Sequence, residues 1–323
     1  MSESIRLSVG EGTLEGTNSA YVLPERGVVI DPGPPSASAW TALRDGITDA
    51  GLALEGIDHV IVTHWHIDHA GLACRLAERA DASLHVHRND APLVGSYATA
   101  RDERLRRDRR TLARWGLPTS IRADVIDRDT PSPLPDSFPV ARREDGDVVA
   151  GVEFVHTPGH TSGHVSLKTD ADVFLGDLLL PTYTPNVGGS DTRLRDPLGQ
   201  YLSSVTRLES TRECGNPGHG TEMCIPDASD GVRRHHRERA EAAFRAISSA
   251  ESAASTPWEV AKRLFGEMTG VHAKFGAGEA AAHLQRLTAV GIVERLDGET
   301  VRYRPVADSY PADVPLTPSF RSA

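Results

Sequence analysis

Residues 60–71 read Val-Ile-Val-Thr-His-Trp-His-Ile-Asp-His-Ala-Gly, so an apolar strand runs directly into a cluster of histidine and aspartate. Imidazole nitrogens and carboxylate oxygens are ordinary zinc ligands. Because residues i and i+2 of an extended segment point the same way, we expect His64 and His66 to reach one ion. Asp68 and His69 follow at the turn into the next helix, and we expect them to face a second ion about 3.5–4 Å away.

Three further candidate ligands stand where a strand gives way to a loop. His160 follows a Pro-Gly turn, Asp177 ends an apolar strand, and His219 lies between two glycines. Binding residues are usually carried by loops on a rigid scaffold. We therefore predict that these three side chains converge with the cluster at 64–69 around a pair of metal ions.

The pattern of elements around these motifs predicts an α/β architecture in layers. Short apolar strands alternate with stretches whose apolar residues recur at helical spacing, and the connections are short. The strands are expected at 27–30, 60–63, 83–86, 152–156, 165–167 and 173–175, and the helices at 36–51, 70–80, 197–210 and 232–250.

The character of the chain changes near residues 251–257. One predicted helix begins at Pro257 after the capping residue Thr256, and a second ends at Gly291. Two short strands then flank an Asp-Gly hairpin signal. Helices followed by a hairpin predict a small winged-helix domain. We thus divide the chain into residues 1–252, which carry the metal motifs, a winged-helix domain at 253–310 and a loosely held tail at 311–323.

The composition narrows the classes of protein. The 323 residues carry 35 Lys and Arg against 45 Asp and Glu, a net charge of −10, which argues against coating nucleic acid through bulk charge. Aromatic residues are only 5% of the chain, so extensive base-stacking platforms are not expected. Three scattered cysteines, no signal-peptide pattern and no long apolar stretch predict a soluble cytoplasmic protein without a membrane partner.

An arginine-rich segment at residues 101–114 has two readings. Seven arginines alternate with three acidic residues there. The segment is either a solvated, ion-paired helix or a basic lid that attracts an anionic substrate.

The motifs Thr-His-Trp-His-Ile-Asp-His-Ala-Gly, Thr-Pro-Gly-His-Thr-Ser-Gly-His, Leu-Gly-Asp and Pro-Gly-His-Gly resemble those of the metallo-β-lactamase-fold hydrolases, over about residues 5–250. The resemblance implies an αββα four-layer sandwich with two metal ions at one edge. It implies that Asp177 bridges both ions and that Asp31 supports the site. It assigns His64, His66 and His160 to the first ion and Asp68, His69 and His219 to the second.

The C-terminal segment resembles the tail of the β-lactamase-like-protein-2 group, which is related to glyoxalase II. Relatives in that group include a single-strand ribonuclease and thioesterases acting on acyl carrier proteins. The resemblance therefore favours a hydrolase whose substrate is a small-molecule or carrier-bound ester or thioester. RNA is the alternative substrate, and a non-enzymatic winged-helix binding protein is the third interpretation. We expect the electrically neutral winged-helix segment to pack against the catalytic domain or to form a homodimer.

The expected mechanism is that of a dinuclear zinc hydrolase with a metal-bridging hydroxide, although the same ligands also accept iron or manganese. Asp68 is the candidate catalytic residue that orients the hydroxide and shuttles its proton. His164 either donates a hydrogen bond to the substrate or fills the wall of the site. Tyr183 and Asn186 are candidate substrate contacts, because they follow Asp177 and should border the cleft.

Overall fold

The computed structural model describes residues 4–13, 16–209 and 211–318, and it contains two six-stranded sheets. In the first sheet an antiparallel hairpin leads into four parallel strands. Its strands, in spatial order, are β1 (Ile5–Thr13), β2 (Gly16–Leu23), β3 (Val28–Ile30), β4 (His59–Val62), β5 (Ser83–His87) and β6 (Ala141–Arg143).

The second sheet is antiparallel except for one parallel pair, β10 with β11. Its strands, in spatial order, are β12 (Met223–Cys224), β11 (Cys214–Pro217), β10 (Val173–Gly176), β9 (Val165–Lys168), β8 (Val152–His156) and β7 (Val148–Val149).

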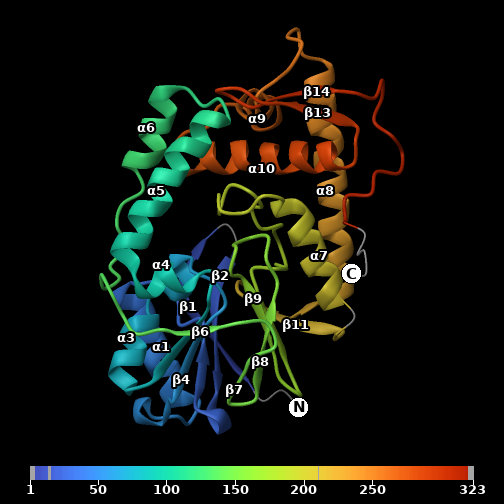
Figure 1. Ribbon diagram of the computed structural model, residues 1–323. Helices are drawn as coiled ribbons and strands as arrows, with labels where there is room; N and C mark the ends of the chain where they lie inside the picture. Colours follow the sequence, from blue (N-terminus) through green and yellow to red (C-terminus); the bar gives the residue numbers. More distant parts are fainter. Residues whose placement is uncertain (1–3, 14–15, 210, 319–323) are drawn as a thin grey trace.

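Helices cover the outer face of each sheet (Figure 1). Helices α1 (Ala37–Asp49) and α3 (Ala73–Ala80) lie against the first sheet, and α7 (Pro197–Glu209) and α8 (Ile225–Ser248) lie against the second. Shorter or more peripheral helices are α2 (Ile67–Ala70), α4 (Ala91–Gly95), α5 (Tyr97–Arg114) and α6 (Thr119–Asp127).

Three apolar cores separate the four layers. Side chains alternate between the two faces of a strand, so Ile30 and Ile61 point towards the second sheet, where Phe154, Leu167 and Phe174 meet them. Their neighbours Val29, Val60 and Val62 pack instead with the apolar faces of α1 and α3. The third core joins the second sheet to α7 and α8. The predicted four-layer αββα sandwich is therefore confirmed.

The C-terminal segment forms two helices and a hairpin, in the predicted order. These are α9 (Pro257–Phe265), α10 (Gly270–Ala289), β13 (Val293–Leu296) and β14 (Arg302–Pro305). Helix α9 starts in a capping box, in which Thr256 accepts from the backbone N–H of Glu259 and the Glu259 carboxylate accepts from that of Thr256.

Helix α10 packs on α6, α7 and α8, so one apolar core continues from the second sheet into the C-terminal helices. This core includes Leu316, near the end of the chain. Residues 319–323 lie outside the described part. The winged-helix assignment, the boundary at 252/253 and the loose tail remain predictions. Among the described helices, none combines the length and the apolar character that a membrane span requires.

Candidate metal centre

The candidate ligands gather at one edge of the sandwich, where the two sheets meet. Strands β3, β4 and β5 are parallel, so their carboxyl ends reach the same edge, and β10 and β11 do the same in the second sheet. Asp31 follows β3, His64 follows β4, and Asp177 follows β10. The loop after β11 is tied to β2, because the N–H of Ser19 donates to the carbonyl of Gly218 at 2.9 Å.

His64, His66 and His160 form a first group of potential ligands, whose nitrogens lie within 4.8 Å of one another. The Nδ1 atom of His66 lies 3.1 Å from Nε2 of His64 and 3.0 Å from Nε2 of His160. Burial lowers the pKa of His64 well below its usual value. Burial, assisted by the charge of His160, lowers that of His66 to about 3. Neutral rings whose nitrogens face one another are suited to binding a cation.

Asp68, His69 and His219 form a second group. The Oδ2 atom of Asp68 lies 3.3 Å from Nε2 of His219 and 3.5 Å from Nε2 of His69. Burial opposes ionisation of both partners, but the opposite charges outweigh it. The neighbouring His69 keeps the pKa of Asp68 below its usual value, and the nearby carboxylates of Asp177 and Asp68 raise the pKa of His219 to about 9.

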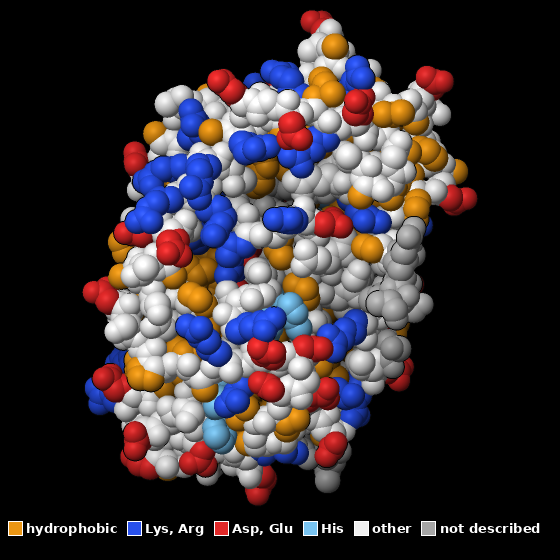
Figure 2. Space-filling model, viewed as in Figure 1, with side chains coloured by type: hydrophobic (Ala, Val, Ile, Leu, Met, Phe, Trp, Pro, Cys, Tyr) orange, Lys and Arg blue, Asp and Glu red, His pale blue; other side chains and the backbone are white. Residues whose placement is uncertain are grey.

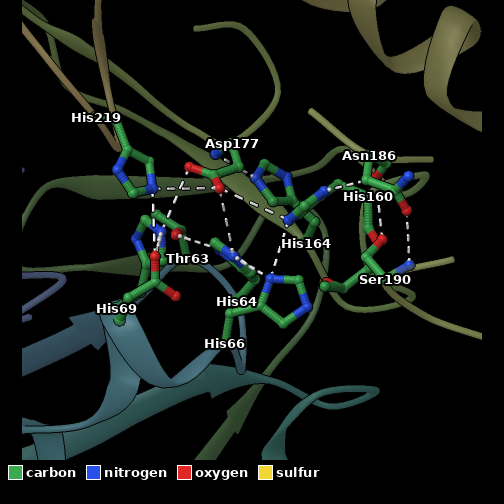
Figure 3. Close-up of polar contacts among 12 residues, drawn as sticks. Thr63, His64, His66, His69, His160, His164, Asp177, Asn186, Ser190 and His219 are labelled. Atoms are coloured by element: carbon green, nitrogen blue, oxygen red, sulfur yellow. Dashed lines mark hydrogen bonds and ion pairs between the residues drawn. The ribbon is translucent and has the colours of Figure 1, made fainter. Parts of the chain in front are cut away.

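Asp177 lies between the two groups (Figure 3). Its Oδ2 atom is 3.6 Å from Nε2 of both His160 and His219 and 3.9 Å from Nε2 of His64. Its Oδ1 atom is 3.4 Å from Nε2 of His69. One carboxylate is therefore in reach of both groups, which is the arrangement that a bridging ligand requires.

The residues present fit a pair of metal ions. Buried polar atoms nearly always find a hydrogen-bond partner, since an unsatisfied one costs about 1–3 kcal/mol. Within the described residues, four buried atoms here have none: Nε2 of His69, Oδ1 of Asp177, and both ring nitrogens of His219. The complete donor set consists of imidazole nitrogens and carboxylate oxygens, the chemistry that zinc accepts.

Hydrogen bonds behind the ligands fix the orientation of the rings. Nδ1 of His160 lies 3.0 Å from the carbonyl of Asn186, and Nδ1 of His69 lies 3.0 Å from Asp31 Oδ2. The N–H on each Nδ1 donates to these oxygens, so the lone pair on Nε2 points into the centre. Asp31 is held in turn by Thr63, whose N–H donates to Oδ1 at 2.7 Å and whose hydroxyl donates to Oδ2 at 2.6 Å.

His164, a candidate for substrate contact or for the wall, is fully buried beside the centre. Its Nε2 accepts from the backbone N–H of Asp177 at 2.9 Å, and its Nδ1 lies 2.9 Å from the hydroxyl of Thr157. Burial lowers the pKa of the ring well below its usual value. Both nitrogens of the neutral ring are therefore used within the protein, which indicates that it positions Asp177.

The two candidate substrate contacts differ in their surroundings. The side chain of Tyr183 is exposed. The side-chain oxygen of Asn186 accepts from the N–H groups of Gly189 and Ser190, at 3.1 and 2.9 Å, so it shapes the loop beside His160.

Two residues that the sequence analysis did not single out also support the site. Asn18 donates to Oδ2 of Asp68 at 3.2 Å. Asp90 accepts from the hydroxyl of Thr161 at 2.6 Å and from the N–H groups of Gly163 and Trp65 at 2.9 and 3.3 Å. Asp90 follows β5 as Asp31 follows β3, and this position after a strand is a signal that could have identified it.

Comparison with known proteins defines the class. Residues 12–213 match the Metallo-beta-lactamase superfamily, and the chain belongs to this superfamily. It is 27% identical to a beta-lactamase-like protein 2 homolog of Drosophila melanogaster, over 71% of this chain and 67% of that protein. It is 26% identical to the probable metallo-hydrolase YqjP of Bacillus subtilis, over 85% of this chain and 89% of that protein. The resemblance noted in the sequence is confirmed.

More distant relatives add a named activity and a solved fold. The chain is 24% identical to an atrochrysone carboxyl ACP thioesterase of Pseudocercospora fijiensis, over 67% of this chain and about half (51%) of that protein. The crystal structure of the metallo-beta-lactamase family protein TTHA1429 from Thermus thermophilus superposes with a TM-score of 0.74 at 24% identity, over 94% of this chain and 98% of that one. The shared fold extends over the C-terminal helices as well as the sandwich.

Proposed function

We propose that this protein is a dinuclear zinc hydrolase that cleaves an ester or thioester. The observation that carries the proposal is the position of Asp177, which lies within 3.9 Å of ligand nitrogens from both groups. When bound, two zinc ions lower the pKa of a water molecule towards neutrality and polarise the carbonyl under attack. The protein supplies the fixed geometry of the ligands and the group that handles the proton.

We assign to Asp68 the transfer of the proton from the attacking water to the leaving group. Its side chain is 33% exposed, whereas those of His69 and His219 beside it are buried. Because Asn18 and His219 hold the carboxylate, it keeps one orientation towards the attacking water. Its lowered pKa keeps it ionised, so it can accept a hydrogen bond from that water and pass its proton to the leaving group.

A pocket on the side of His160 that faces away from the other candidate ligands supports an acyl substrate. The pocket has a volume of about 440 Å³, and its lining includes Asn186, whose carbonyl orients His160. Phe265, Met268 and Phe275 from α9, α10 and their connection supply apolar surface. Glu267 and Glu279 also line the pocket, so it suits the hydrocarbon part of an acyl group better than a negatively charged phosphate backbone. The thioesterase names of distant relatives agree with this substrate class.

The test combines metal analysis with two parallel assays. Purified protein is expected to hold close to two zinc ions per chain, and to hydrolyse short-chain acyl thioesters. His66→Ala should lose more than about 100-fold in kcat/KM, since it removes one of the three candidate ligands of the first group. His235→Ala, a half-buried histidine on α8 away from the ligands, is the matched control. Cleavage of single-stranded RNA without thioester turnover would instead establish the nuclease, and a metal-loaded protein inert on both would overturn the hydrolase.

A further inference from the structure

Helix α5 is strongly basic in an acidic protein. Its residues, Tyr97–Arg114, include seven arginines and three acidic residues, whereas the whole chain has a net charge of −10. Figure 2 shows Lys and Arg side chains gathered over this helix, at the upper left of the molecule. The two sides of the helix use their arginines differently.

The inner side of α5 is ion-paired and holds the helix in place. Arg104 donates to both carboxylate oxygens of Asp129, at 2.7 and 2.9 Å, and Arg101 also pairs with Asp129. Asp108 is buried and accepts from Lys274 of α10 at 2.8 Å. These contacts link α5 to the chain after α6 and to α10, so the inner arginines have a structural role.

The outer side of α5 lacks such partners. No ion pair or hydrogen bond joins the side chains of Arg107, Arg109 and Arg110 to any other described residue. Arg106 lies 3.9 Å from Asp102, and both side chains are 65% exposed. Ion pairs this exposed contribute little to stability. Like charges three or four residues apart destabilise a helix, so Arg106 repels Arg109 and Arg110, and Glu103, at the same spacing before Arg106, offsets only part of this repulsion. The outer arginines therefore point to a partner.

The same helix also touches the candidate centre. The guanidinium carbon of Arg104 lies 5.3 Å from the ring centroid of Trp65, and the Trp65 ring lies 4.7 Å from that of His66. Building on the proposed function, we infer that the outer side of α5, defined by Arg106, Arg107, Arg109 and Arg110, docks an acidic carrier protein that presents its acyl group as a thioester on a flexible arm. Complementary charge would capture the carrier, and the arm would deliver the thioester to the centre.

The observations favour an acidic protein over a nucleic acid. The 18 residues of α5 span about 27 Å, the size of one face of a small domain. Single-stranded nucleic acids are also held by stacking on exposed aromatic rings. Among the exposed large apolar side chains of the described residues, Tyr183 is the one aromatic, and it is not on α5. The negative charge of the rest of the chain would repel a long polyanion that extends beyond the helix.

The experiment compares two substrates that share one reaction. An acidic acyl carrier protein charged with an octanoyl thioester is assayed beside a small uncharged octanoyl thioester. The triple variant Arg107→Glu, Arg109→Glu and Arg110→Glu should lower kcat/KM for the carrier about tenfold or more and leave that for the small thioester unchanged. Added salt should slow only the carrier reaction. Binding of the labelled carrier, read by fluorescence anisotropy, should weaken by a similar factor whether or not the protein turns it over.

A matched control has the same change in charge elsewhere. Arg79, Arg142 and Lys262 are exposed and lie on other elements, so their triple change to glutamate should leave carrier binding nearly unaffected. Equal losses in both triple variants, or no loss in the first, would overturn the docking surface. Binding of labelled single-stranded RNA that is tighter than binding of the carrier, and that is lost in the first variant but kept in the control, would assign the surface to RNA instead. If no thioester is turned over, the proposed function fails, while the binding measurement still decides the docking.

Discussion

Asp31 and His69 are joined by a hydrogen bond of 3.0 Å between a carboxylate oxygen and Nδ1, at the base of the candidate metal centre. Asp31 reaches this position in the left-handed region of the backbone, with φ of 47°, a conformation that non-glycine residues adopt mainly where the surrounding structure holds them. The backbone N–H and the hydroxyl of Thr63 also donate hydrogen bonds to the carboxylate of Asp31. The bond keeps a proton of His69 on Nδ1, so Nε2, which no described residue satisfies, is the atom left for a metal ion.

Changing Asp31 to Asn should reverse this proton arrangement. The N–H of Thr63 requires an oxygen at one position, so the new amide nitrogen would face His69 and donate to Nδ1. The ring would then carry its proton on Nε2, directed at the metal position. We expect zinc affinity to fall about 10–100-fold, measured by competition with a chelator. Asp45→Asn, on the exposed side of α1, is the control, and equal affinities for both variants would contradict the argument.

Gly218 should be unable to accept a side chain, although it is not itself a ligand. A Cβ atom at this position would overlap Oδ1 of Asp177 and lie 2.7 Å from Cε1 of His69. Gly218→Ala should therefore displace both side chains and reduce the bound metal, measured by elemental analysis, by at least about tenfold. Gly231→Ala is the matched control, because no atom lies within 4 Å of its added Cβ. That variant should keep its metal and gain up to about 1 kcal/mol in helix stability.

Asp90 and Glu144 should differ greatly in importance, although each pairs with an arginine at 2.6 Å. Asp90 is fully buried, so Asp90→Ala leaves Arg193 with Asp191 as its remaining acidic partner and leaves the hydroxyl of Thr161 without its acceptor, and should lower the free energy of unfolding by about 3 kcal/mol. Both members of the Glu144–Arg88 pair are more than half exposed, so Glu144→Ala should cost less than about 1 kcal/mol. Urea denaturation measures both, and similar losses would refute the distinction.

The buried pair His236 and His283 should make stability depend on pH. Burial lowers the pKa of His283 from 6.5 to about 3, and that of His236 also falls well below its usual value. Between pH 6.5 and 3 the unfolded chain therefore binds protons that the folded chain excludes, so stability is complete above 6.5 and falls as the pH decreases. His283 alone should account for about 2 kcal/mol between pH 7 and pH 5.

His283→Leu should flatten this pH dependence of stability. The comparison uses metal-free protein, in which the candidate metal centre contributes equally to the pH dependence of the variant and of the unaltered protein. The variant also loses the hydrogen bond from Nδ1 to the carbonyl of Glu279, so the slopes of the two curves are compared rather than their heights. Denaturation at pH 7, 6 and 5 provides the slopes. Parallel curves for the two proteins would show that the pair does not control stability.

Zinc should stabilise the folded protein through the two groups of ligands. A ligand that binds only the folded state adds about 2.7 kcal/mol when its concentration is 100 times its dissociation constant. We expect the melting temperature to rise on adding zinc and to fall on adding a chelator. His219→Ala should show a smaller rise, because it removes one ligand of the second group. A melting temperature independent of zinc would contradict the predicted ligand set.

Local patterns were sufficient for the starts of two helices. The helix expected at 36–51 is α1 (Ala37–Asp49), which Ser36 caps by accepting from the N–H of Ala39. Helix α9 begins at Pro257 as predicted. Such starts depend on neighbours in the chain, because a capping residue satisfies N–H groups two or three residues away.

The arginine-rich segment at residues 101–114 shows a property that local sequence patterns did not predict. Its composition left a solvated, ion-paired helix and a basic lid as alternatives, and the structure shows a helix that is ion-paired on its inner side. Arg104 pairs with Asp129 on the inner side, whereas Arg109 on the outer side is exposed and unpaired among the described residues. Which side of a helix meets an acidic partner depends on the elements packed against it, and its own sequence does not contain that information.

The sequence by itself determined the chemistry of the site, since the order of histidines and aspartates after apolar strands already specifies nitrogen and oxygen donors. The tertiary structure alone decided what holds these side chains within reach of one another. Asn18 meets Asp68 across 50 positions of chain, and Thr161 meets Asp90 across 71. Contacts at such separations form only when two sheets pack and bring strand ends to one edge, and packing depends on the whole set of apolar faces rather than on any one segment.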